Sequence, residues 1–422
     1  MTDALPAPSS PIAYRDFRLY WVARLCASLA TVAMVVVLGY QFYDIARTDY
    51  GLSIRDASFQ LGLLGLAQFI PLAVMTPVAG WAADRFERRT VACISYGVDC
   101  LIALTLGALT YADALTLPMI YALAAMHGAA RSFLGPAMSG IAPNTVPPAV
   151  LPNAIAMSTL AWQIASVAGP ATGGLMFAAR HDSPYWLSAG LLLVSGIALL
   201  MIRPIRPDHV PGHPVRKIID GLKYTWNERF LLGAITLDLF AVLAAGVTAL
   251  LPVYARDILH TGPEGLGWMR GAIAAGAVAV ALWLSFRPLR TNVGVKMLWA
   301  VVVFGLATVG FGLSQSLWLT LVFLAITGGA DMLSVYVRGS LVQLNTPDSM
   351  RGRVSAVSGL AISASNELGE MQSGVAAALI GPVGAVVFGG TVAVGVTAIW
   401  AYIFPELRNA RTFEPQYRNA SP

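Results

Sequence analysis

The stretch that decides the fold is Gly80-Trp81-Ala82-Ala83-Asp84-Arg85-Phe86-Glu87-Arg88-Arg89, which lies between two long apolar runs. Six of its ten residues are glycine or charged, whereas charged residues make up only 12% of the whole chain. A short basic connection between two spanning runs is typical of a membrane loop held in the cytoplasm by its arginines. Gly80 permits close approach of the backbone, and Asp84 offers a carboxylate to a helix N-terminus or an arginine. The stretch therefore predicts a multi-span membrane protein.

Composition extends this prediction to the whole chain. Hydrophobic residues make up 57% of 422 residues, above the apolar share of a soluble domain. Each span needs about 20 apolar residues, and the chain is long enough for many of them. We expect twelve helices, over 19–44, 55–79, 90–111, 115–138, 152–179, 184–203, 230–255, 264–286, 293–313, 316–341, 353–380 and 383–404.

A shift in composition near the middle divides the chain. The segment 204–229 is rich in Pro, His, Lys and Arg, and its second part is amphipathic, as expected of a helix at the membrane surface. We expect a cytoplasmic N-terminal segment (1–18), a six-helix bundle (19–203), this linker (204–229), a second six-helix bundle (230–404) and a cytoplasmic tail (405–422). A few identities at an offset of 200 residues, such as Gly128 with Gly328 and Pro147 with Pro347, favour a repeat of the first half in the second.

The distribution of Lys and Arg predicts the orientation. The basic residues gather in alternate connections, and the opposite connections hold only four: Arg47, Arg55, Arg180 and Arg256. By the positive-inside rule, both termini lie in the cytoplasm, and we expect a bacterial inner membrane location. The net charge of +5 is explained by this topology, so it does not indicate nucleic-acid binding.

The pattern G-x-x-x-D-R-x-x-R-R at Gly80–Arg89 resembles the signature loop of the major facilitator superfamily. Further segments resemble its enterobactin-exporter-like branch, the transmembrane secretion effectors, from about Tyr14 to Arg408. They are Arg131-Ser-Phe-Leu-Gly-Pro-Ala, Leu251-Pro-Val-Tyr-Ala-Arg-Asp-Ile-Leu-His, Gly265-Leu-Gly-Trp-Met and Asn345-Thr-Pro-Asp-Ser-Met-Arg-Gly-Arg-Val354. The resemblance implies an all-α fold of twelve transmembrane helices in two pseudo-symmetric six-helix bundles. It also implies a gating loop of Gly80, Asp84, Arg85, Arg88 and Arg89, whose charges close the cytoplasmic side; topology alone is the alternative role.

The fifth expected helix carries a second motif. Gly169, Pro170, Gly173 and Gly174 are similar to one end of the motif found in proton-coupled exporters, although its upstream glycines are missing. Gly169 and Gly173 form a small-xxx-small face that lets another helix approach closely. Ordinary helix packing and an exporter-specific role both fit this segment.

Charged side chains inside the expected helices point to mechanism, because an ionisable group in the bilayer must be paired, hydrated or neutralised. Five carboxylates are candidates for proton coupling: Glu367, Glu370, Asp331, Asp238 and Asp99. Arg270 and Arg338 are intramembrane cations. In the alternative interpretation, carboxylates pair with arginines only to hold the structure together.

Other residues are candidates for lining a central substrate cavity: Arg131, His127, Gln41, Trp162, Tyr336 and Asn366. Arg131 and Asp331 occupy equivalent positions at the offset of 200 residues. In the superfamily, the first, fourth, seventh and tenth helices line the cavity. Arg131 is therefore expected either to pair with Asp331, to attract an anionic substrate, or to keep a structural role common to the branch. Core packing is the alternative role for Trp162 and Tyr336.

These features predict a secondary transporter, and most specifically a proton-coupled exporter of an amphipathic small molecule such as a siderophore or drug-like compound. An importer, a lipid flippase or a non-transporting sensor is the alternative. The chain contains no G-x-x-x-x-G-K-[ST], H-E-x-x-H or G-x-S-x-G motif, so we expect no ATP-driven transport and no enzyme activity. Cys26, Cys93 and Cys100 lack disulfide or metal spacing, and we expect no metal, no cofactor and a monomer.

Overall fold

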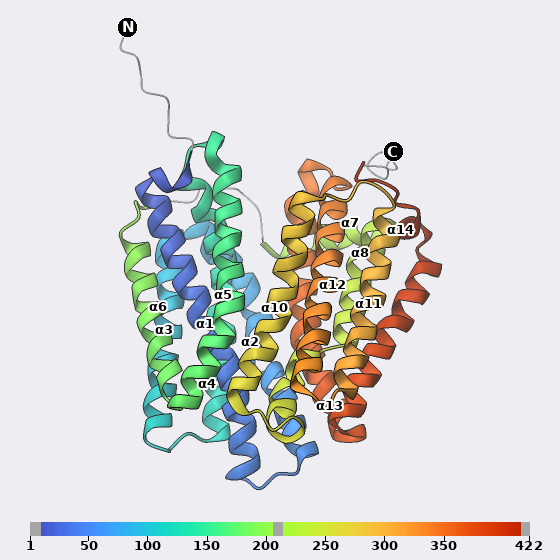
Figure 1. Cartoon of the computed structure of the whole chain (residues 1–422). Helices are drawn as coiled ribbons and strands as arrows, with labels where there is room; N and C mark the ends of the chain where they lie inside the picture. The colour runs from blue at the N-terminus through green and yellow to red at the C-terminus, as the bar shows by residue number, and fades with distance from the viewer. Residues whose placement is uncertain (1–9, 206–213, 415–422) are drawn as a thin grey trace. The chain divides into compact units, whose positions relative to one another are not determined.

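The structure is a computed structural model that describes residues 10–205 and 214–414. These residues form helices and connecting loops, and no strand occurs among them (Figure 1). In chain order the α-helices are α1 (Arg15–Thr48), α2 (Ile54–Arg85), α3 (Arg88–Tyr111), α4 (Leu117–Ile141), α5 (Leu151–Ala179), α6 (Ser183–Leu200), α7 (Pro214–Asn227), α8 (Arg229–Ala244), α9 (Leu251–Val253), α10 (Gly262–Phe286), α11 (Val293–Leu313), α12 (Leu317–Leu344), α13 (Asp348–Ile403) and α14 (Pro405–Asn409).

Ten helical stretches among the described residues are long and apolar enough to cross a membrane. They do not include α4, in which His127 and Arg131 interrupt the apolar sequence. The two helices expected at 353–380 and 383–404 form a single element, α13. This element is therefore only one of the ten stretches. Its two arms meet at Gly381, where φ is 80°, a conformation that glycine adopts without steric cost. Pro382 follows and cannot donate the next helical hydrogen bond.

The connection at Gly80–Arg89 is shorter than the sequence suggests. Helix α2 continues through Arg85 and α3 begins at Arg88, so only Phe86 and Glu87 are non-helical. The expected end at residue 79 was therefore wrong. Arg85 lies in the last turn of α2, where a cation is favourable beside the unpaired carbonyl groups.

The helix expected over 230–255 is broken. After α8 ends at Ala244, the chain forms a 3₁₀ turn, η4 (Val247–Leu250), then the short α9 and a π-helical turn, η5 (Tyr254–Ile258). Gly246 precedes η4 with a non-helical backbone, and Pro252 in α9 has no N–H to donate. The π turn is defined by the hydrogen bond from the Leu259 N–H to the Tyr254 carbonyl, at 2.8 Å.

The helices group into two compact units. The first holds the described residues of Met1–Val37 and Ile70–Pro211, and the second those of Leu38–Phe69 and Gly212–Pro422. Helices α1 and α2 therefore each pass from one unit to the other.

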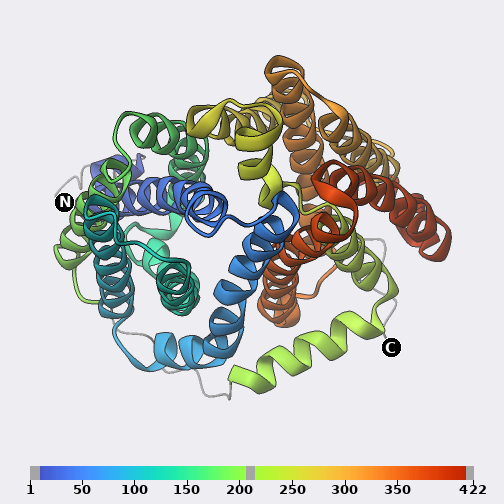
Figure 2. The ribbon, with the colours of Figure 1, turned by 90° about the horizontal axis from the view of Figure 1, so that it is seen from below.

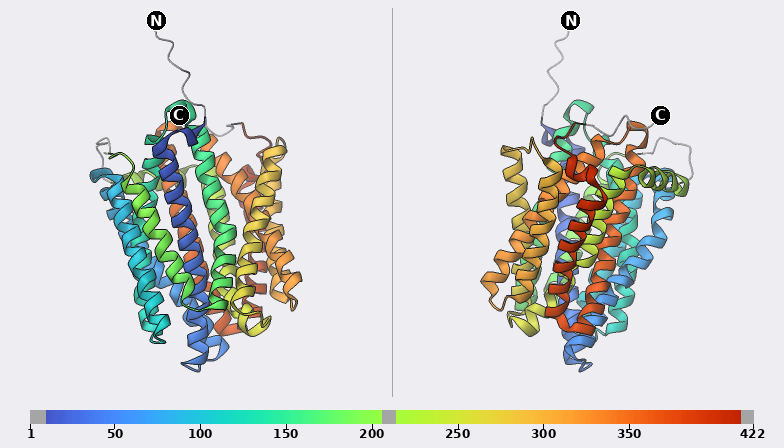
Figure 3. Two further views of the ribbon diagram at one scale, coloured as in Figure 1. Left: turned by 60° about the vertical axis from the view of Figure 1, so that its left-hand side comes forward. Right: turned by 90° about the vertical axis from the view of Figure 1, so that its right-hand side faces the viewer.

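In the first unit, α3 packs against α4 and α6, and α5 lies against α1 (Figure 3). Gly169 and Gly173 face Val32 and Ala33 of α1 so closely that a β-carbon at Gly173 would lie 2.9 Å from the Ala33 carbonyl oxygen. The small-xxx-small face thus allows direct helix contact.

In the second unit, α13 packs against α8 and α11, while α12 packs against α10 and α11. Helix α7 runs crosswise to these helices at their outer edge: Figure 2 shows α7 from the side and the other helices end-on. It packs against α13, where a β-carbon at Gly221 would lie 2.7 Å from the Arg353 carbonyl oxygen.

The α1–α5 contact gives a stability prediction. Gly173→Ala forces the two backbones apart and should destabilise the protein by about 1–3 kcal/mol, as overpacking does. Gly190→Ala on α6 is the matched control, because no atom lies within 4 Å of a β-carbon there. Thermal unfolding in detergent should show a lower midpoint for Gly173→Ala only. Equal midpoints for the two variants would contradict the packing.

Candidate functional site

A cavity of about 280 Å³ lies among the helices of the second unit. Its walls come from α8, α10, α11, α12, α13, η4 and the two residues before η4. Val242, Ile273, Phe304 and Ile362 are among its apolar lining residues. Its polar lining residues are Asp238, Thr248, Thr327, Asp331, Arg338, Ser365 and Asn366. Three candidates from the sequence, Asp238, Asp331 and Asn366, thus share one cavity.

An ion pair forms one side of this cavity. Arg338 on α12 contacts Asp238 on α8 through its guanidinium, and the two residues are 5% and 9% exposed. Such a pair is costly to break, because either partner alone would be a buried charge. The sequence marks Arg338 only as an intramembrane cation, since its partner lies 100 positions earlier in the chain.

Asp331 stands apart from this pair. It lies two helical turns before Arg338 on α12 and lines the same cavity. Among the residues that the structure describes, its carboxylate has no hydrogen-bond or ion-pair partner. Of the two carboxylates that line the cavity, Asp238 is therefore held in an ion pair and Asp331 is not.

The two glutamates of α13 lie outside the cavity lining. Glu367 is 7% exposed. The Glu370 carboxylate packs on α2, with Oε2 3.0 Å from the position of a β-carbon at Gly65. Glu370 also interacts electrostatically with Arg270 of α10, which donates a 3.1 Å hydrogen bond to the carbonyl of the cavity residue Thr248. Both glutamates have interaction partners.

The remaining candidates are dispersed. In the first unit, His127 Nδ1 of α4 lies 2.8 Å from Asp99 Oδ1 of α3, and both residues are buried. Arg131 is one turn beyond His127 and also has a partner, while Trp162 of α5 is 46% exposed. In the second unit, Gln41 is buried on α1 and has a partner. The Tyr336 ring contacts Phe413 edge-on and does not line the cavity described above.

The arginines of the α2–α3 connection cap other helices of the first unit. Arg88 donates to the Gly140 carbonyl at the end of α4 at 3.2 Å. Arg89 donates to the carbonyls of Leu200 and Ile202, at and just beyond the end of α6, at 2.9 and 2.6 Å. The last carbonyl groups of a helix lack helical partners, so a cation there is favourable and complements the helix dipole. The Gly140 carbonyl also accepts a hydrogen bond from the Asn144 side chain at 2.7 Å. Asp84, on the last turn of α2, has a partner as well.

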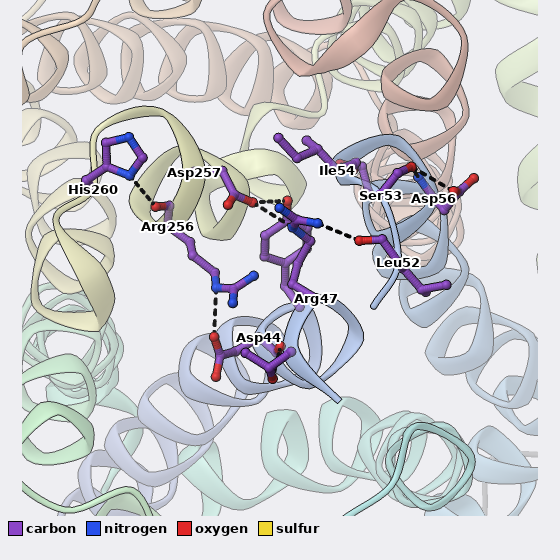
Figure 4. Close-up of polar contacts among 12 residues, drawn as sticks. Asp44, Arg47, Leu52, Ser53, Ile54, Asp56, Arg256, Asp257 and His260 are labelled. Atoms are coloured by element: carbon purple, nitrogen blue, oxygen red, sulfur yellow. Dashed lines mark hydrogen bonds and ion pairs between the residues drawn. The ribbon is translucent and has the colours of Figure 1, made fainter. Parts of the chain in front are cut away.

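A second charged cluster lies in the second unit, at the end opposite α14 (Figure 4). Arg256 Nε lies 2.7 Å from Asp44 Oδ1, and Arg47 Nε lies 3.2 Å from Asp257 Oδ2. The Tyr43 hydroxyl donates to the same Asp257 oxygen at 2.5 Å. The end of α1 is thereby joined to the π turn η5 through three polar contacts.

The buried pair gives a prediction for stability. Arg338→Met should lower stability by about 3–5 kcal/mol, because Asp238 is left as an unpaired buried charge. Adding Asp238→Leu removes that charge and should recover most of the loss. Thermal unfolding of the two single variants and the double variant measures this coupling. A double variant no more stable than Arg338→Met would contradict it.

Comparison with known proteins agrees with this architecture. A family model described as transmembrane secretion effector matches residues 6–418. The multidrug efflux pump Tap of Mycobacterium tuberculosis (strain ATCC 25618 / H37Rv) is 29% identical over 332 residues, covering 75% of this chain and 78% of Tap. The enterobactin exporter EntS of Shigella boydii serotype 18 (strain CDC 3083-94 / BS512) is 28% identical over 414 residues, covering 95% of this chain and 94% of EntS.

Among solved structures, a bacterial homologue of the human lysosomal transporter Spinster has a similar fold. The TM-score is 0.69 at 15% identity, with 94% of this chain and 97% of the other covered. The family match spans nearly the whole chain, and the relatives are transporters rather than enzymes. The chain belongs to the transmembrane secretion effector family and is a multi-pass membrane transporter of the major facilitator type.

Proposed function

We propose that this protein exports an amphipathic small molecule in exchange for protons. The observation that carries the proposal is the unpartnered Asp331 carboxylate in the cavity beside the Asp238–Arg338 ion pair. A carboxyl group that is neutral when the cavity is closed to water and charged when it is hydrated can carry one proton per cycle. The neighbouring ion pair keeps the other two lining charges compensated, so Asp331 alone changes the charge of the cavity.

The outward direction and the class of substrate are supported by relatives. Tap is named as a multidrug efflux pump and EntS as an enterobactin exporter, and both are similar over most of this chain. The mixed lining of the cavity suits an amphipathic molecule, since apolar walls bind its body and a few polar groups orient it. A siderophore and a drug-like compound are the substrates to test first.

In this proposal, transport proceeds by alternating access between two six-helix bundles (19–203 and 230–404), with both termini in the cytoplasm. Helix α4 and the two arms of α13 complete the twelve spans. The membrane potential supplies about 2.3 kcal/mol per charge for each 100 mV, which drives the cycle outward as protons enter. The protein acts as a monomer in the bacterial inner membrane.

The α2–α3 connection has a gating role in the same cycle. Asp84 closes the cytoplasmic side in one state, while Arg88 and Arg89 hold the ends of α4 and α6. Asp84→Asn keeps the size of the side chain but removes its charge, and should slow transport by roughly tenfold, about 1.4 kcal/mol. Transport at the normal rate by a correctly inserted Asp84→Asn protein would exclude this role.

The test of the function uses proteoliposomes with an imposed pH gradient, to which a catecholate siderophore and a lipophilic cationic dye are offered separately. Wild-type protein should move one of them in response to the gradient. Asp331→Asn cannot exchange a proton and should abolish gradient-driven movement while substrate exchange without a gradient persists. Glu367→Gln, tested in parallel, should retain gradient-driven movement, because Glu367 lies outside the cavity lining.

Asp182→Asn is the matched control for removing a carboxylate. Asp182 lies between α5 and α6, where the hydrogen bond from Arg180 keeps its pKa below the usual value. This variant should transport normally. Movement that ignores the gradient in wild-type protein would refute proton coupling. Movement of neither compound would favour the importer, flippase or sensor alternatives.

A further inference from the structure

We propose that α7 (Pro214–Asn227) binds the surface of the bilayer, with three apolar side chains inserted among the lipids. These are Ile219, Leu222 and Trp226, which we call the α7 anchor. By the distribution of Lys and Arg in the sequence, the surface that α7 binds is the cytoplasmic leaflet. The inference goes beyond the proposed function, because it names a lipid-binding surface and does not depend on proton coupling.

The α7 anchor is an apolar strip that is largely exposed in the protein. Ile219 is 56% exposed, Leu222 is 52% exposed and Trp226 is 69% exposed. Residues three, four and seven positions apart recur on one side of a helix, so the three side chains lie within an arc of about 60°. Large apolar side chains gathered on one exposed strip indicate contact with lipid or with another protein.

The other two sides of α7 face protein and water. A β-carbon at Gly221 would lie 2.7 Å from the Arg353 carbonyl oxygen of α13, and Thr225 on the same side is 3% exposed. Lys223 and Asn227 are exposed polar residues on the remaining side. The apolar strip lies between these sides, about 110° from the packed one and about 90° from the polar one. A helix that lies in the surface of a bilayer beside a membrane protein has these three surroundings.

Two attachments place α7 at the level where the spanning helices begin. At its end, only Glu228 separates α7 from Arg229, the first residue of a stretch that is able to cross a membrane. Near its middle, Gly221 packs on Arg353, close to the start of the stretch Met350–Ile403. Helix α7 runs crosswise to these stretches (Figure 2). With a length of about 21 Å, it is also too short to cross a hydrocarbon layer of about 30 Å.

Size and charge favour the bilayer as the partner of this strip. Three half-exposed side chains offer much less area than the roughly 1,200 Å² that a stable protein interface buries. The sequence of α7 holds three basic residues and one acidic residue, Asp220, whose carboxylate lies 3.6 Å from the Arg353 guanidinium. The remaining charge is positive and suits the negatively charged cytoplasmic leaflet. Trp226 is of the residue type that prefers the headgroup region.

The contacts of α7 also hold the start of α13. Arg353 belongs to the segment Asn345–Val354, which the sequence marks as typical of the branch. Its ion pair with Asp220 has both side chains 40% exposed and contributes little by itself. The backbone contact at Gly221 therefore carries most of the attachment, and the α7 anchor joins it to the membrane surface.

The depth of α7 in the membrane can be measured with nitroxide labels on the full-length protein. Cys26, Cys93 and Cys100 are first replaced by alanine, and one cysteine at a time is then placed on α7. The protein is held in vesicles of phosphatidylethanolamine and phosphatidylglycerol. For each label, collisions with oxygen, which concentrates in lipid, are compared with collisions with a water-soluble nickel chelate.

Labels at Ile219→Cys, Leu222→Cys and Trp226→Cys should be reached by oxygen and protected from the nickel chelate. Lys223→Cys and Asn227→Cys, on the polar side of the same helix, are the matched controls and should show the reverse. Anchor labels that meet the nickel chelate as often as the controls would overturn the proposal. Anchor labels protected from both reagents would also overturn it, since a second copy or another protein would then cover the strip.

The attachment to α13 is tested by hydrogen exchange of the full-length protein in a bilayer of the same lipids. Leu222→Asp removes a half-exposed apolar side chain from the lipid, and should raise the exchange rate of the backbone amides of residues 352–356 about threefold to tenfold. Asn227→Asp adds the same charge on the polar side and should leave this rate unchanged. Exchange in α11 should be the same in all three proteins. Equal rates at residues 352–356 in the two variants would overturn the attachment.

Neither measurement uses transport, so the two proposals fail separately. Insertion of the α7 anchor in a protein that shows no gradient-driven transport would support the anchor and refute proton-coupled export. Gradient-driven transport by a protein whose anchor labels lie in water would support export and refute the anchor.

Discussion

The structure depends on one constraint, which is that a charge within the bilayer must find a partner, water or a proton. Asp238 meets Arg338, and Asp99 meets His127, so each carboxylate is paired across two helices. Arg270 lies between the Thr248 carbonyl and Glu370. Against this background Asp331 is exceptional, because it lines a cavity without a partner among the described residues. In the proposed function, this carboxylate exchanges the coupling proton.

Close contacts at glycine residues also hold the helices of each unit together. Gly173 brings α5 onto the Ala33 backbone of α1, and Gly62 with Gly374 brings the backbones of α2 and α13 together.

Much of the helical pattern is predictable from the sequence because it depends on local composition. Apolar runs of spanning length place most helices, but they miss the continuation of α2 through Arg85 and the break between α8 and η5. Residue type alone selects Asp238, Asp331 and Asn366 as candidates. Their convergence on one cavity, and the pairing of Asp238 with Arg338, depend on contacts between distant segments, which no local pattern encodes.

The central claim concerns the protonation state of Asp331, and infrared difference spectroscopy measures that state directly. Purified wild-type protein is titrated across neutral pH and the carbonyl stretch of protonated carboxyl groups is followed. The account predicts a carboxyl band that appears and disappears reversibly in this range, shifts when substrate binds and is absent in Asp331→Asn. A band that persists unchanged in Asp331→Asn, or no titrating carboxyl in the wild-type protein, would contradict it.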